Sequence, residues 1–133
     1  MINYDYDYIE NRYGHDVGVC IGKGWVALVN KLTDDIHHIL DKQNIDSDSA
    51  DIKLVIHQIK EKFGGLRYYY ALSHDADIYY DLDEGTRNSV SRLVAHIEQV
   101  SYHICEECGK YGERDSNNGW IKTVCEEHIR GKE

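Results

Sequence analysis

The chain has 133 residues, of which 41% are hydrophobic, and its 24 acidic and 15 basic residues give a formal net charge of −9. This length favours one domain, the hydrophobic content is too high for a disordered chain, and no apolar run reaches the roughly 18 residues of a membrane-spanning helix. Because phosphate binding usually requires a basic face, the acidic balance argues against direct binding of nucleic acid. The charge either serves solubility or favours basic protein surfaces as partners. The first residues lack the positive charge and the apolar stretch of a secretory signal, so we expect a cytoplasmic protein.

Residues 1–13 interleave tyrosines with acidic residues, as in the run Tyr4-Asp5-Tyr6-Asp7-Tyr8. Strict alternation is typical of a half-buried strand or an extended arm. Tyrosine-rich acidic segments also suit protein recognition, and both interpretations stay open. Farther along, Cys20 lies in the apolar stretch 17–21, so we expect its thiol to be a small buried side chain and not a reactive group.

Residues 24–41 have the apolar spacing of a helix, which follows the glycines Gly22 and Gly24. A second helix is predicted to begin at an N-cap on Asp48 or Ser49 and to end at Gly64-Gly65. A third is predicted over residues 84–104. The three apolar stripes are Trp25, Leu28, Val29, Leu32, Ile36, Ile39 and Leu40; then Ile52, Val55, Ile56, Ile59 and Phe63; then Val90, Leu93, Val94, Ile97, Val100 and Ile104.

Residues 66–72 are rich in tyrosine and leucine and predict a strand, and residues 78–80 predict a second one. The turn between them carries His74, Asp75 and Asp77. Together the elements predict an α+β protein with three main helices and a short antiparallel sheet. We expect a single domain over residues 1–133, with a helical and strand body at 1–104 and a zinc-binding segment at 105–133.

Four residues of metal-binding types occur near the end of the chain, in the pattern Cys105-x2-Cys108, sixteen residues, Cys125-x2-His128. In a cytosolic chain such clustering favours a metal over disulfides. Zinc in structural sites takes four tetrahedral nitrogen or sulfur ligands, and a two-residue gap lets each pair converge on one ion. The pattern therefore predicts one structural Zn²⁺, with no open position for catalysis.

The residues around these ligands predict a zinc knuckle that resembles a treble-clef or zinc-ribbon site. Gly109 frees the backbone after the first pair, residues 119–124 read as a strand, and a short helix is expected to open at Cys125. His103 is the alternative fourth ligand. A second metal site drawn from His37, His38 and His57 is possible by residue type, but helical histidines beside acids are more often solvated.

Motifs for catalysis are missing from the sequence, which holds no phosphate loop, dinucleotide fingerprint, nucleophile elbow or His-Glu-x-x-His metalloprotease pattern. The acidic stretches at 46–51 and 75–77 also lack the glycine and glutamate positions of a calcium loop. We therefore expect a protein that is not an enzyme.

Three motifs occur in combination, namely Gly22-x-Gly24-Trp25, the run IKEKFGGLRYYY at 59–70, and CxxCG…GWIxTxCxxH at 105–128. In these the chain resembles a family of small phage and prophage proteins that share a zinc-stabilised fold, over about residues 18–128. Among small acidic phage proteins it is similar to the type II-A anti-CRISPR inhibitors. That resemblance implies Cas9, a host defence protein, as the partner, bound by a monomer with no membrane and no direct nucleic-acid contact. The expected contact surface is acidic and consists of Asp46, Asp48, Asp51, Asp75, Asp77, Asp81, Asp83 and Glu84.

Two other functions compete with inhibition. A zinc-dependent nucleic-acid-binding regulator would need basic residues gathered on one face, for which the candidates are Lys53, Lys60, Lys62 and Arg67. A nucleotide-binding sponge or enzyme would need a pocket lined by the tyrosines at 68–70 and 79–80, with Arg67 or Arg87 nearby.

Overall fold

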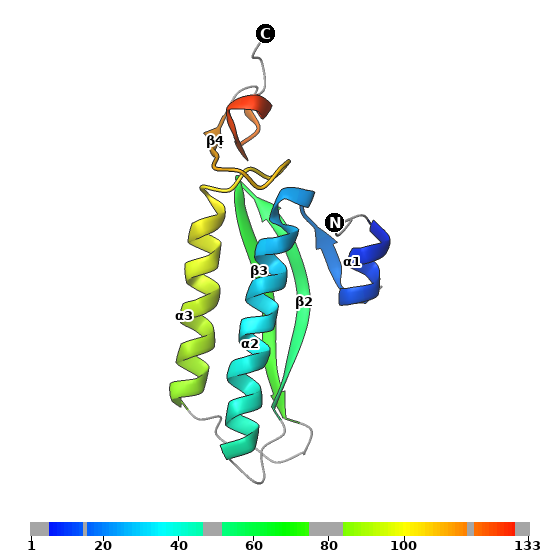
Figure 1. Ribbon diagram of the computed structural model, residues 1–133, viewed down its shortest axis with the longest axis vertical. Helices are drawn as coiled ribbons and strands as arrows, with labels where there is room; N and C mark the ends of the chain where they lie inside the picture. Colours follow the sequence, from blue (N-terminus) through cyan, green and yellow to red (C-terminus); the bar gives the residue numbers. More distant parts are fainter. Residues whose placement is uncertain (1–5, 15, 47–51, 75–83, 117–118, 130–133) are drawn as a thin grey trace.

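The computed structural model describes residues 6–14, 16–46, 52–74, 84–116 and 119–129. The elements, in chain order, are α1 (Tyr6–Tyr13), β1 (Gly18–Cys20), the 3-10 turn η1 (Lys23–Trp25), α2 (Val26–Asp46), β2 (Ile52–Lys62), β3 (Gly65–His74), α3 (Glu84–Ser101), β4 (Glu113–Asp115), β5 (Lys122–Val124) and the 3-10 turn η3 (Glu126–His128). The long helices α2 and α3 lie side by side on one face of the β2–β3 hairpin, and the segment after α3 lies at one end of the molecule (Figure 1).

The strands confirm the α+β class but not a purely antiparallel sheet. The main sheet has the order β1-β2-β3, with β1 parallel to β2 and β2 antiparallel to β3. A separate antiparallel pair, β4 and β5, belongs to the C-terminal segment. Helix α2 confirms the first predicted helix and continues five residues beyond its expected end at residue 41, and α3 confirms the third.

The predicted second helix is wrong, because residues 52–62 form the strand β2. A register shift between Ile56 and Gln58 inserts one residue and moves the strand's alternation by one position. The inward residues fall at Ile52, Leu54, Ile56 and Ile59, whereas Val55 and Phe63 of the predicted helical stripe are exposed. Phe63 and Gly64 form the turn of a hairpin and Gly65 begins β3, so the glycine pair is not a helix C-cap.

Two expectations about the N-terminal third are also wrong. Residues 6–13 form the helix α1 and not a strand, because the phenols of Tyr8 and Tyr13 find hydrogen-bond partners on one helix. Tyr13 donates to Asn30 Oδ1 over 2.6 Å, and Asn30 Nδ2 donates to the Tyr8 hydroxyl over 2.8 Å. Cys20 is exposed, because alternation along β1 points Val19 into the core and Cys20 away from it.

The core lies between the sheet and the two long helices. Its buried members are Trp25, Val29, Leu32, Ile36, Leu40, Ile52, Ile59, Leu66, Tyr68, Val90, Val94 and Ile97. The outer edge of β3 is covered by α3, since the Leu66 N–H donates to Ser101 Oγ and the Tyr68 N–H donates to Glu98 Oε2. These side chains occupy backbone donors that an exposed edge strand would offer to another chain.

The strand predicted at residues 78–80 lies outside the described residues. So do both N-cap candidates of the predicted second helix and, of the expected acidic contact surface, Asp48, Asp51, Asp75, Asp77, Asp81 and Asp83.

Candidate metal centre

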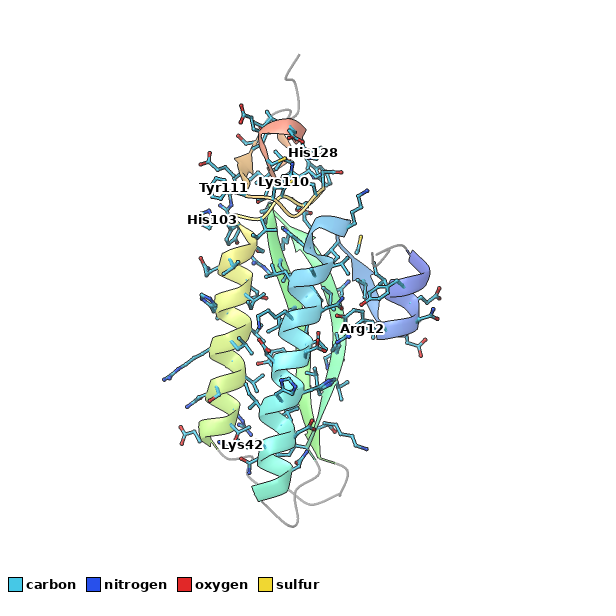
Figure 2. All side chains as sticks on the ribbon, in the orientation of Figure 1. Arg12, Lys42, His103, Lys110, Tyr111 and His128 are labelled. Carbon is cyan, nitrogen blue, oxygen red and sulfur yellow. The ribbon has the colours of Figure 1, made fainter. Side chains whose placement is uncertain are left out.

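The four predicted ligands come from three short pieces of the C-terminal segment and meet at one point. Cys105 and Cys108 lie in the turn after α3, Cys125 directly follows β5, and His128 ends η3. Their ligand atoms all lie within 4.8 Å of one another. Figure 2 shows His128 at this end of the molecule, near Lys110 and Tyr111.

The distances within the cluster fit a tetrahedral ion. Bond lengths of about 2.3 Å to sulfur and 2.0 Å to nitrogen place tetrahedral sulfurs about 3.8 Å apart and sulfur and nitrogen about 3.5 Å apart. The Cys108 and Cys125 sulfurs are 3.6 Å apart, and His128 Nδ1 lies 3.6 Å from Cys105 Sγ and 3.1 Å from Cys125 Sγ. A disulfide requires about 2.05 Å, so the sulfurs are not bonded to each other. The three thiols and one imidazole can hold a metal ion.

The electrostatics of the cluster favour the ionised, thiolate form of Cys125. Burial opposes ionisation of Cys125, but hydrogen bonds with His128 and Cys108 outweigh it and lower the pKa of this thiol to about 7. Because the thiolate is the species that binds metal, Cys125 is ready to bind at neutral pH. Cys105 and Cys125 are buried against the body, while Cys108 and His128 are exposed.

The turn that carries the first two cysteines has the backbone of a knuckle. The Gly109 N–H donates to the Cys105 carbonyl over 2.9 Å, and the Cys105 N–H donates to the Lys110 carbonyl over 2.7 Å. Gly109 has φ +81°, a left-handed conformation that residues with a Cβ rarely adopt. The predicted role of this glycine is confirmed.

The Gly-x-Gly-Trp motif before α2 is the surface on which the knuckle packs. The Gly24 N–H donates to the Glu106 carbonyl over 2.9 Å, and the buried Trp25 indole donates to the Ile104 carbonyl over 2.8 Å. A Cβ on Gly24 would lie 2.6 Å from Gly109 N and closer still to the Cys105 carbonyl oxygen. The motif therefore has a packing role.

Two buried polar residues that the sequence analysis missed connect the knuckle to the hairpin. The Thr123 N–H donates to Glu106 Oε2 over 2.7 Å, and the Thr123 hydroxyl donates to the Gly64 carbonyl over 2.6 Å. Thr123 is fully buried and Glu106 is 4% exposed. Burial raises the pKa of Glu106 to about 6, although the Thr123 hydrogen bond opposes this. The position of Thr123 in the sequence does not reveal a hydrogen-bond partner 59 residues away.

The histidines considered as alternative ligands lie outside the cluster. His103 is exposed and stacks on Tyr111, with ring centroids 6.2 Å apart. His37 and His38 are exposed on α2, and His57 is exposed on β2. Among the described residues, the only group of three or more metal-binding side chains is the cysteine and histidine cluster.

The tyrosines proposed to line a nucleotide pocket do not share a face. Tyr68 is buried, and its hydroxyl lies 2.9 Å from that of Thr33, whereas Tyr69 is 41% exposed on the opposite side of β3. Alternation along a strand makes this separation unavoidable. Tyr79 and Tyr80 lie outside the described residues, Arg67 contacts the Tyr102 hydroxyl, and Arg87 is exposed on α3.

Two residues of the expected acidic contact surface lie within the described elements. Asp46 ends α2 and the exposed Glu84 begins α3, and both helix ends lie at the end of the molecule away from the metal cluster (Figure 1).

Comparison with protein-family models, with curated proteins and with solved structures gives no match for this chain. None of the helices in the described parts of the chain combines the length and hydrophobicity needed to cross a membrane.

Proposed function

We propose that the protein is a non-enzymatic binding protein that acts by covering a surface of a partner protein, and that a structural Zn²⁺ holds its contact surface together. The observation that carries this proposal is a pair of exposed aromatic side chains, Phe63 and Trp120, whose exposed fractions are 60% and 65%. They line a common cavity of about 270 Å³ with Ile121. Aromatic residues of this kind dominate the binding energy of protein interfaces.

The backbone at Phe63 supports a role in contact. Phe63 has φ +54° and Gly64 has φ +79°, so both turn residues of the hairpin are left-handed. Asparagine or glycine fits the first of these positions best, and a bulky residue there costs about 1–2 kcal/mol. An aromatic ring that strains the turn and is then left exposed adds little to stability, which favours a role in binding.

Zinc is the metal that best suits the ligand set. Three sulfurs and one nitrogen match structural zinc sites, and four protein ligands leave no position for a substrate. Trp120 lies in the segment leading to the ligand Cys125. Phe63 precedes Gly64, whose carbonyl accepts the hydrogen bond from the Thr123 hydroxyl. We therefore expect loss of the ion to separate the aromatic pair.

Cas9 is the partner that the resemblance to type II-A inhibitors implies, and inhibition would follow from stoichiometric binding. Carboxylates on an acidic protein can compete with nucleic acid for basic protein surfaces. The net charge of −9 supports this mechanism. The identity of the partner rests on that resemblance and on charge.

The test is a pull-down against Cas9 with and without guide RNA, followed by a DNA-cleavage assay. A Phe63→Asn/Trp120→Ala variant should lose binding and inhibition, while Tyr111→Ala should keep both. Tyr111 is a matched control because it is equally exposed, at 66%, on the same segment. Full cleavage at a large molar excess would exclude Cas9. A lysate capture in which nothing is enriched by the native protein over the double variant would refute protein binding through this surface.

A further inference from the structure

The side of the main sheet that faces away from α2 and α3, here called the open face, carries a concentration of positive charge. Alternate residues of the three strands point to it: Gly18 and Cys20 of β1; Lys53, Val55, Gln58, Lys60 and Lys62 of β2; Gly65, Arg67, Tyr69, Ala71 and Ser73 of β3. The intervening hydrophobic residues belong to the core or pack against it, namely Val19, Ile52, Leu54, Ile56, Ile59, Leu66, Tyr68, Tyr70 and Leu72.

The open face is basic although the chain is strongly acidic. Its four charged side chains, Lys53, Lys60, Lys62 and Arg67, are all cations. The acidic residue of these three strands, Glu61, points to the other side, where its carboxylate accepts the Gly64 N–H. The net charge of −9 is therefore unevenly distributed, and the described strands place cations on one surface.

Two of the cations lie directly opposite each other. Lys60 and Arg67 are register partners across β2 and β3. Like charges in such a pair repel each other across a sheet. An anion bound across the pair would offset that repulsion.

Aromatic rings lie among these cations. Tyr69 is 41% exposed on the open face, and the Lys60 ammonium lies 6.0 Å from its ring centroid. At the edge of β3, Arg67 Nη1 lies 3.5 Å from the Tyr102 hydroxyl, and the Arg114 guanidinium lies 3.9 Å from the Tyr102 ring centroid. The hydrogen bond from Arg67 and the charges of both arginines lower the pKa of Tyr102. Tyr102 thus connects Arg67 of the open face to a second arginine, in a hollow that Glu113 also lines.

We propose that the open face binds single-stranded RNA, with Lys60 and Arg67 on the phosphates and Tyr69 stacked on a base. Cations supply affinity for the phosphate backbone, and stacking on tyrosine requires an unpaired base, which a duplex does not offer. The exposed polar side chains Gln58 and Ser73 lie on the same face and suit the ribose 2′-hydroxyl. Lys62 is left out of this site, because its ammonium lies 5.8 Å from the Phe63 ring centroid and it lines the cavity of the aromatic pair Phe63 and Trp120.

The experiment is a fluorescence-anisotropy titration of a labelled oligouridine of about 12 nucleotides, within the site sizes of single-strand binders. The salt concentration is varied between about 50 and 200 mM. The native protein should bind, with affinity falling as salt rises. Lys60→Ala/Arg67→Ala should reduce the slope of log K against log salt by about 1.4, because each phosphate contact on a single strand contributes about 0.7. Tyr69→Ala should weaken binding about fivefold or more.

The matched control is Lys42→Ala/Arg87→Ala, which removes the same two charges from exposed positions on α2 and α3. Figure 2 shows Lys42 on α2, the helix that covers the other face of the sheet. This variant and Lys60→Arg should keep the native affinity. Melting curves establish that each variant is folded.

Three results would overturn the proposal: no binding at the lower salt concentration, an equal loss of affinity in the α2/α3 control, or equal affinity for a deoxyuridine strand or an RNA duplex of the same length. Phe63→Asn/Trp120→Ala should leave RNA affinity unchanged, so failure here and failure of the protein-binding proposal can be told apart.

Discussion

Replacing Gly24 by alanine tests the packing of the metal segment on the body. The new methyl group would lie 2.6 Å from Gly109 N and 2.8 Å from Cys108 N, where an ordinary van der Waals contact needs 3.4 Å or more. Both contacts are backbone atoms of the knuckle, so the knuckle has to move away from η1.

That movement breaks two hydrogen bonds, from Gly24 N–H to the Glu106 carbonyl and from the Trp25 indole to the Ile104 carbonyl. Each contributes about 1 kcal/mol to stability. The indole is fully buried, so an unsatisfied donor adds about 1–3 kcal/mol. The expected loss in free energy of unfolding is therefore about 3–5 kcal/mol.

The measurement is urea denaturation of the zinc-loaded protein, with Gly18→Ala as the matched control. A Cβ on Gly18 meets Gln58 Cγ at 3.6 Å, an ordinary contact on an exposed strand. Alanine there should be neutral or stabilise the protein by up to about 1 kcal/mol. A loss below about 1 kcal/mol in Gly24→Ala, or equal losses in the two variants, would refute the packing argument.

Further predictions concern the metal, one buried hydroxyl and alkaline pH. Cys125→Ser should lose the bound ion in elemental analysis and lower the melting temperature, whereas Cys20→Ser should do neither; stoichiometric metal in the first variant would exclude the ligand set. Thr123→Val keeps the side-chain volume but removes the donor to the Gly64 carbonyl, so it should cost about 1–3 kcal/mol in chemical denaturation, and a neutral result would show that this bond adds nothing. Burial raises the pKa of Tyr68 despite its hydrogen bond to Thr33, so the neutral phenol stabilises the fold below about pH 10 and this contribution is lost as the pH rises further. Tyr68→Phe should therefore lose less stability than the native protein above about pH 10, and parallel pH curves would contradict this.

The parts that the sequence predicted are those fixed by local spacing. The pairs Cys105/Cys108 and Cys125/His128 each have a gap that is meaningful by itself, and the structure brings the four side chains together. Helices α2 and α3 have long apolar stripes with a single phase, so their periodicity leaves no ambiguity.

The parts that the sequence did not predict depend on distant partners. In β2 the inserted residue and the outward-facing Val55 together gave a strand the apolar spacing of a helix, and only the pairing with β3 identifies it. The tyrosines of α1 alternate like a strand, yet two of them find their hydrogen-bond partner on α2. Glu106 and Thr123 carry no local signal, because each is recognisable only by the contact it makes with another segment.

The hydrogen bond from the Trp25 indole to the Ile104 carbonyl spans 79 residues of chain. During synthesis the ribosome makes Trp25 long before its acceptor, so the indole stays unpaired until α3 has left the exit tunnel. The ligands Cys125 and His128 emerge later still, and closure of the metal site follows the emergence of the rest of the described body. A nascent chain from which residues 105–128 have not yet emerged can therefore present the helices and the β2–β3 hairpin with an unfinished end.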